Sequence, residues 1–191
     1  MMLFPDMAKS NPTHDTGGKV KLALKAGITG TAEFGGKNEE YRYRLTRTWD
    51  SAKPFALLVL MNPSTADSNT DDRTIAKCCR FACAWGYGGI FVANTFAYRC
   101  TDQKRLIGEV SDLIGSDNDR HIIEVAKKAA IVVFAYGKPQ RKALRARGKE
   151  LARLLIEKAH VNPHILSLGK DGTPKHPLYL KKTLKPVEWN L

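Results

Sequence analysis

The sequence lacks long hydrophobic runs. No stretch of its 191 residues approaches the roughly 20 consecutive apolar residues that a membrane-spanning helix requires. The N-terminal residues do not combine a basic region with a long apolar one, so we expect no secretory signal. Both absences predict a cytoplasmic protein without a membrane partner, and its thiols are then expected to be reduced.

Cysteine is also scarce, with four residues in the chain. Cys78, Cys79 and Cys83 fall within six residues, but they form no Cys-x-x-Cys pair. Adjacent Cys78 and Cys79 would point in different directions on a helix. We therefore expect that these three residues and Cys100 are buried free thiols, and that the protein has no metal and no cofactor.

Acidic residues are outnumbered by basic ones, 19 to 31, which gives a net charge of +12 and an isoelectric point near 9.6. This excess favours a polyanionic partner, nucleic acid first and an anionic membrane surface second. The alternative is a generally basic surface with no such partner.

Length and an ordinary apolar content of 43% predict one globular domain with a sizeable core. Residues 1–18 are polar and lack periodicity, so we expect a flexible tail there and the domain over 19–191. Within the domain, residues 28–49 have the pattern of a β-hairpin, because "TAEF" precedes the turn "GGKN" and "YRYRLTRTW" alternates in period two. The core is expected over 55–180.

Apolar runs alternate with helical patterns after this hairpin. Strands are expected at 55–61, 89–96, 130–137 and 164–169, and helices at 71–87, 101–115, 117–129 and 139–159. Strands that are apolar throughout and alternate with helices indicate a parallel sheet covered on both faces. The expected fold is a three-layer αβα architecture with a central four-stranded, mostly parallel sheet and an N-terminal β-hairpin.

Ligands bind beyond the carboxyl ends of the strands in such a sheet. Four loops are expected there, at 62–67, 94–99, 136–140 and 169–180. Each holds a residue that a mere turn would not need: Asn62, Asn94, Lys138 and His176. Taken singly, an Asn-Pro pair is usually a turn and a lone histidine is usually structural, but together on one edge these residues predict a site.

Four segments resemble, in order and separation, the motifs of the uracil-DNA glycosylase superfamily over roughly 55–180. They are "LLVLMNPST", "GIFVANTFAYR", "IVVFAYGKPQRK" and "KHPLYL". Three departures are visible. Leu60 replaces a usual glycine, Leu178 replaces a usual serine, and the cysteines that precede motif one in iron–sulfur branches are missing. Cys83 and Cys100 alone cannot hold such a cluster.

The resemblance implies a reaction in which a flipped base is cut from its sugar by water. It implies that Asn62 positions the water, that His176 donates to the departing base and that Asn94 reads a pyrimidine edge. Asp67 is a rival water activator, although it is also an ordinary turn residue. The aromatic residue that stacks on the base is left open among Phe81, Trp85, Tyr87 and Phe96. Ser64 stands where uracil-specific members have a bulky tyrosine, so the wall facing C5 is expected to be open.

Positive charge near these motifs is expected to contact DNA phosphates. On the helix expected at 139–159, Leu144, Leu151 and Leu155 mark the buried stripe, which leaves its basic residues outside. The expected phosphate contacts are Lys138, Arg141, Lys142, Lys170, Lys175 and Lys181. Leu178 and Tyr179 are expected to fill the space that the flipped base leaves.

The sequence therefore predicts a monomeric, metal-independent, monofunctional DNA glycosylase for a modified pyrimidine. A C5-substituted base is expected, and a hypermodified viral base would make the enzyme part of antiviral defence. Three alternatives stay open: repair of uracil or mismatched thymine, hydrolysis of free nucleotides, and non-catalytic DNA binding.

Overall fold

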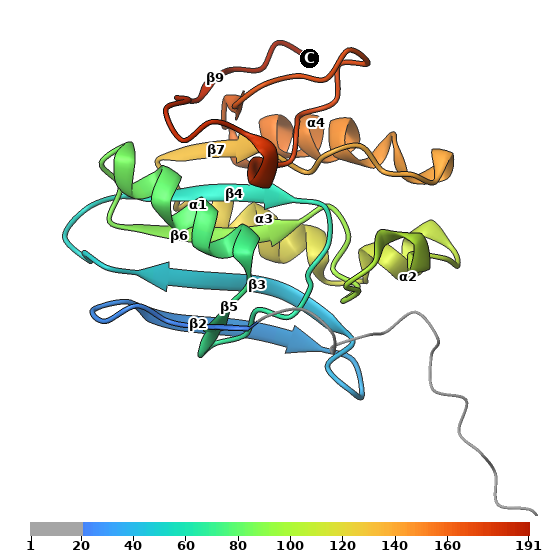
Figure 1. Ribbon diagram of the computed structural model, residues 1–191. Helices are drawn as coiled ribbons and strands as arrows, with labels where there is room; N and C mark the ends of the chain where they lie inside the picture. The colour runs from blue at the N-terminus through green and yellow to red at the C-terminus, as the bar shows by residue number, and fades with distance from the viewer. Residues whose placement is uncertain (1–20) are drawn as a thin grey trace, which may run out of the picture.

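The apolar runs form the parallel centre of a sheet in the computed structural model, which describes residues 21–191 (Figure 1). The tail predicted over 1–18 lies outside the described residues. Four parallel strands stand side by side in the order β6-β4-β7-β8. Their bounds are β4 Phe55–Leu60, β6 Gly89–Asn94, β7 Ile131–Phe134 and β8 Pro163–Ile165. These match the four predicted strands, and the α/β class is confirmed.

The strand order makes the chain turn back across β4. From β4 the chain crosses to β6 on one side, and then returns to β7 on the other. The point between β4 and β7 is therefore a topological switch point, where the loops leaving the two strands diverge and leave a crevice.

The predicted four-stranded sheet was too small, because the sheet has seven strands within residues 21–191. The hairpin of β2 (Thr29–Gly35) and β3 (Tyr41–Thr48) is not a separate unit, since β3 pairs antiparallel with β6 from Leu45 opposite Val92 to Thr48 opposite Gly89. On the other side, β9 (Val187–Glu188) pairs antiparallel with β8. A further two-stranded sheet joins β1 (Leu22–Ala23) to β5 (Thr70–Asp71).

Helices cover both faces of the sheet (Figure 1). Helix α1 (Arg73–Ala84) packs on alternate residues Ala56, Leu58 and Leu60 of β4. Helices α3 (Asn118–Ala126) and α4 (Arg147–Ala159) share a second cluster with Leu57 and Val59, which point the other way. The predicted stripe of Leu144, Leu151 and Leu155 is buried in this second cluster.

Two predicted helices are shorter than expected. The segment 139–159 contains a single 3₁₀ turn, η2 (Lys142–Leu144), before α4 begins at Arg147. There the Arg145 guanidinium donates to the carbonyl oxygens of Pro139 and Gln140, which fixes a loop instead of a helical turn. The segment 101–115 divides at Gly108, whose φ of +111° no helix allows, into η1 (Gln103–Arg105) and α2 (Val110–Ile114).

The cysteines are free, and Cys78, Cys79 and Cys100 are buried as predicted. Cys83 is exposed, so the prediction was wrong for that residue, which lies on the outer side of α1. Burial raises the pKa of Cys79 to about 12, which keeps its thiol protonated. Within residues 21–191, no group of His, Cys, Asp or Glu is arranged to hold a metal, and no helix is long and apolar enough to cross a membrane.

Candidate active site

A cavity of about 1000 Å³ lies beyond the carboxyl ends of β4, β7 and β8, at the switch point. Its volume is within the usual range for a small-molecule pocket. Four loops contribute to its wall: residues 61–64 after β4, 100–103 beyond β6, 136–140 after β7, and 169–179 after β8. Three of the four loops predicted from the sequence therefore meet at one cavity. After β6, the residues that line the cavity are 100–103 instead of the predicted 94–99.

Asn62 lines this cavity with a side chain whose orientation is fixed. Its Nδ2 donates to the carbonyl oxygens of Cys100 at 2.7 Å and Pro63 at 3.0 Å. Carbonyl oxygens only accept, so the amide nitrogen must face them. Oδ1 then faces the other way, and no residue of the described part of the chain donates to it. Asn62 Oδ1 is thus a hydrogen-bond acceptor whose orientation at the cavity wall is fixed.

His176 lines the cavity from the opposite loop and has a defined tautomer. Its Nδ1 accepts a hydrogen bond from the backbone N–H of Leu178 at 3.3 Å, which caps the short η3 turn (Pro177–Tyr179). An accepting Nδ1 places the proton of a neutral imidazole on Nε2. In this tautomer the one N–H of the imidazole is at Nε2.

Gly137 holds the His176 loop close to the end of β7. Its N–H donates to the Pro174 carbonyl oxygen at 2.9 Å, and its φ is +72°. A Cβ at this position would lie 3.1 Å from the His176 Cβ. Glycine is therefore favoured here both for its conformation and for the close approach of the two loops.

Three lysines, Lys138, Lys170 and Lys175, line the cavity. Their contact with DNA phosphates stays a prediction. Lys138 Nζ lies 2.8 Å from Asp171 Oδ2, and this contact lowers the pKa of Asp171 to about 2. Leu178 and Tyr179 also line the cavity, and Tyr179 is 85% exposed at its edge. The lining of the cavity therefore combines cations with an exposed aromatic ring.

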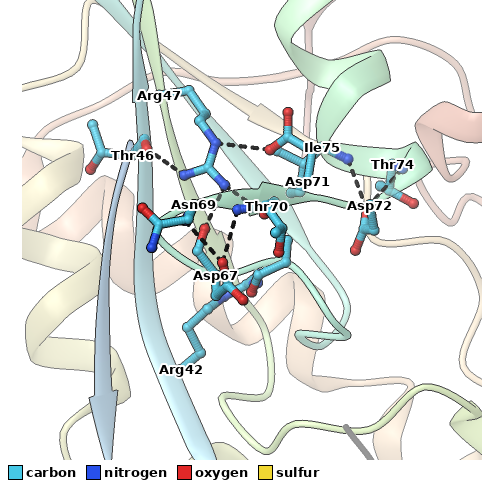
Figure 2. Close-up of polar contacts among 11 residues, drawn as sticks. Arg42, Thr46, Arg47, Asp67, Asn69, Thr70, Asp71, Asp72, Thr74 and Ile75 are labelled. Carbon is cyan, nitrogen blue, oxygen red and sulfur yellow. Dashed lines mark hydrogen bonds and ion pairs between the residues drawn. The ribbon is translucent and has the colours of Figure 1, made fainter. Parts of the chain in front are cut away.

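Arg42 and Asp72 also line the cavity, and neither was predicted from the sequence to do so. Arg42 is 2% exposed, and its Nη1 donates to the Ala66 carbonyl oxygen at 2.7 Å. Burial lowers the pKa of Arg42 to about 10, against the opposing influence of the Asp72 charge, so it stays cationic. Asp72 Oδ1 accepts from the N–H groups of Thr74 and Ile75 at the start of α1 (Figure 2). A buried arginine in a strand must find partners, but these partners are remote in sequence.

Asn94 and Phe96 are almost fully buried and do not line the cavity. Asn94 lies behind Arg42, whose Nη2 is 3.5 Å from its Oδ1, and its Nδ2 has no partner among the described residues. Among the other stacking candidates Phe81, Trp85 and Tyr87, none lines the cavity either. The aromatic residues that do so are Tyr136 and Tyr179.

Asp67 also lies outside the cavity wall, in a turn beside β5. Its Oδ1 accepts from the N–H groups of Asn69 at 2.9 Å and Thr70 at 2.8 Å (Figure 2). This arrangement is that of an ordinary turn residue, the alternative to water activation for Asp67. The carboxylates that do line the cavity are those of Asp72, Asp102 and Asp171.

Ser64 lines the cavity two residues after Asn62, and its Oγ is buried without a described partner. Arg141, Lys142 and Lys181 do not line it. Arg141 donates instead to the Gly108 carbonyl oxygen at 2.6 Å. These three cations remain candidates for contacts outside the cavity only.

Comparison with known proteins places the site within a family. Residues 42–178 match the model of DUF1643, described as a protein of unknown function. No curated protein and no solved structure matches the chain. The matched segment starts at Arg42 and ends at Leu178, so it includes both Asn62 and His176. The chain therefore belongs to the DUF1643 family.

Proposed function

We propose that the protein is a metal-independent DNA glycosylase that releases a modified pyrimidine by hydrolysis. The observation that carries the proposal is the pairing of an oriented acceptor with an oriented donor in one cavity. Asn62 presents Oδ1, and His176 presents Nε2–H. This pairing agrees with the roles that resemblance to the uracil-DNA glycosylase superfamily implies for these two residues.

The reaction needs a base extruded from the helix, because its N-glycosidic bond is unreachable inside a duplex. In the cavity, Asn62 Oδ1 accepts a hydrogen bond from the attacking water and holds it below the sugar. An amide is a poor base, so Asn62 orients the water more than it deprotonates it. As the N-glycosidic bond breaks, its electron pair moves to the base, and His176 Nε2–H donates a hydrogen bond to the base oxygen that gains negative charge. The water forms its bond to C1′ of the sugar, and the proton that it loses passes to the released base anion.

Arg42 and Asn94 act together on the base edge in this proposal. Arg42 reaches the cavity and offers donors, while Asn94 supports it from behind. Asn94 then acts on the pyrimidine indirectly, because its Oδ1 accepts a hydrogen bond from Arg42 and so helps to position the guanidinium. Asp72 adds an acceptor to the same wall. Donors and acceptors side by side suit a pyrimidine edge, which carries both.

The lysines around the cavity bind the flanking phosphates, and Leu178 and Tyr179 occupy the space left in the helix. Ser64 gives the small wall beside C5, so the preferred base is C5-substituted. A hypermodified base of a viral genome fits this wall, which would give the enzyme a role in antiviral defence. Excision of uracil or mismatched thymine is the alternative reaction of the same site.

Mass spectrometry of bases released from a panel of natural and modified DNAs tests the proposal. We expect one C5-substituted pyrimidine to be released, leaving an intact abasic strand that breaks only after alkali or heat. Release from free nucleotides but not from DNA would make the protein a nucleotide hydrolase. Salt-sensitive DNA binding with no base released from any DNA would make it a non-catalytic module.

A further inference from the structure

Leu178 and Tyr179 line the active-site cavity on one side and a second groove on the other. This second groove encloses about 760 Å³ and lies along α1. Its charged residues are all basic: Arg73, Lys77, Arg80 and Lys182. We name it the α1 groove. The exposed ring of Tyr179 thus forms a ridge between the candidate active site and a groove with only positive charge.

Helix stability does not account for the cations of the α1 groove. Arg73, Lys77 and Arg80 are spaced four and three residues apart on α1, so they form one stripe of like charge, which is unfavourable. Arg73 stands at the first helical position, where the helix dipole disfavours a cation. Within residues 21–191, Arg73, Arg80 and Lys182 have no acidic partner. A bound anion would offset all of these costs.

The α1 groove is held in a fixed relation to the cavity. Lys77 Nζ donates to the Leu180 carbonyl oxygen at 2.7 Å, and Trp85 Nε1 donates to the Leu184 carbonyl oxygen at 3.0 Å. Both bonds attach the segment that follows η3 to helix α1. A ligand that occupies the cavity therefore meets the α1 groove at a defined place, across Tyr179.

We propose that the α1 groove binds the phosphodiester backbone of the DNA strand that leaves the cavity across Tyr179. This inference rests on the proposed function. The stripe from Arg73 to Arg80 is about 10 Å long at 1.5 Å per residue. Successive phosphates lie farther apart along the backbone than the rise of about 3.4 Å per nucleotide along the duplex axis, so that length holds about two phosphates. Binding there keeps the strand in place while one nucleotide is turned into the cavity.

The test compares two variants that lose the same charge. One is the triple variant Arg73→Gln, Arg80→Gln and Lys182→Gln, which keeps Lys77 because it anchors Leu180. The matched control is Lys127→Gln, Lys128→Gln and Arg153→Gln, which removes exposed cations at the end of α3 and on α4. Fluorescence anisotropy with a labelled DNA duplex gives the affinity of each variant over a range of salt concentrations.

The groove variant is expected to bind DNA at least about tenfold more weakly than wild type near 0.1 M salt. Its slope of log K against log salt should be lower by about two, because each phosphate contact contributes about 0.9. The control should stay within threefold of wild type and keep the slope. Equal losses in both variants would overturn the inference, since only overall charge would then matter. A groove variant that loses affinity for anionic lipid vesicles but not for DNA would also overturn it.

The two proposals fail in different ways. If wild type releases a base while the groove variant binds DNA like the control, the α1 groove proposal is wrong and the reaction stands. If no DNA yields a released base while the groove variant loses affinity and slope, the reaction is wrong and the groove stands.

Discussion

The side-chain nitrogen of Asn62 donates to the backbone carbonyl oxygen of Cys100 at 2.7 Å, across a separation of 38 residues. The bond joins the loop after β4 to the segment beyond β6. The backbone adds a second tie, because the Cys100 N–H donates to the Pro63 carbonyl oxygen at 2.9 Å. The direction of the Asn62 oxygen is therefore set by bonds between the segments that follow two neighbouring strands.

Asn62→Ala should reduce base release by about 10²-fold or more, because the attacking water loses the acceptor that positions it. DNA affinity should stay within a few-fold of wild type, since Asn62 contacts no phosphate in the proposed complex. Single-turnover base release and anisotropy measure the two quantities. A variant that keeps most of its activity would refute the assignment, and the carboxylates of Asp72 and Asp67 would then be tested in turn.

Asn62→Asp should be less stable than wild type, and the loss should grow with pH. A carboxylate oxygen would face the two carbonyl oxygens that now accept from Nδ2, so only the protonated acid could donate to them. The folded state therefore raises the pKa of the introduced carboxyl above its unfolded value, near 3.9. Stability is closest to wild type below that value and falls as pH rises through the folded pKa.

Thermal melts of Asn62→Asp, Asn62→Ala and wild type between pH 4 and pH 8 measure this trend. Asn62→Ala is the control, because it loses the same hydrogen bonds but has no group that titrates. Parallel curves for the two variants across this range would show that the two carbonyl groups do not raise the pKa of the introduced carboxyl.

Gly137→Ala should damage the site beyond its effect on the backbone. A left-handed alanine costs about 1–2 kcal/mol wherever it occurs. At Gly137 the new Cβ also lies 3.1 Å from His176 Cβ, so the imidazole must shift. Gly86→Ala is the control, since Gly86 has a φ of +91° and no atom within 4 Å of an added Cβ.

Urea denaturation should show a loss of stability in both glycine variants. Base release should fall at least tenfold in Gly137→Ala and remain near the wild-type rate in Gly86→Ala. If the two variants are equally active, the position of His176 does not depend on the Gly137 contact.

Local patterns predicted the parallel strands because a strand that is buried on both faces is apolar at every position. The run Phe55 to Leu60 is apolar at every position, and all but Phe55 are buried. The sequence of β3 has no comparable pattern that indicates its pairing with β6. Arg42 and Arg47 resemble the solvent-facing cations of a half-exposed strand, but the structure buries both. Their partners, Ala66 and Asp71, are 24 residues away, and no local pattern relates them.

In the candidate site, too, local sequence predicted some residues, while the positions of others depend on contacts with distant parts of the chain. Asn62 and His176 could be named from short motifs, because each follows a strand or loop signal directly. Asn94 could be named in the same way, but its distance from the cavity could not be predicted. That distance depends on Arg42, which comes from another strand and lies between Asn94 and the cavity.

Asp71→Ala should lower the free energy of unfolding by about 3–5 kcal/mol, because it leaves a buried guanidinium without its counter-charge. Arg47 has no exposed side-chain surface, and its Nε donates to Asp71 Oδ1 at 2.8 Å (Figure 2). Its other nitrogens donate to backbone oxygens of Thr46, Asp67 and Thr70. Arg47 therefore joins the hairpin to the segment that leads into α1.

Urea denaturation of Asp71→Ala is compared with that of Asp50→Ala, which breaks the exposed Lys53–Asp50 pair of 2.9 Å. The Asp50 variant should be almost as stable as wild type, because water screens an exposed pair. Similar losses in the two variants would mean that the buried pair contributes no more than the exposed one.

Ser64→Tyr should block release of C5-substituted pyrimidines while sparing any activity on uracil. Ser64 lines the cavity two residues after Asn62, so a tyrosine there would project into the space that a C5 substituent needs. A small wall permits the larger base without creating a preference for it, because removing a clash adds no attraction. Ser64→Ala is the matched control: it keeps the wall small, removes only a hydroxyl that has no described partner, and should retain the wild-type range of bases.

Competition between uracil and a C5-substituted base in otherwise identical DNA measures the effect of Ser64→Tyr. The ratio of the two release rates should shift toward uracil in Ser64→Tyr and stay unchanged in Ser64→Ala. If wild type releases uracil alone, or if Ser64→Tyr still releases the bulky base at the wild-type rate, the wall at Ser64 does not select the base.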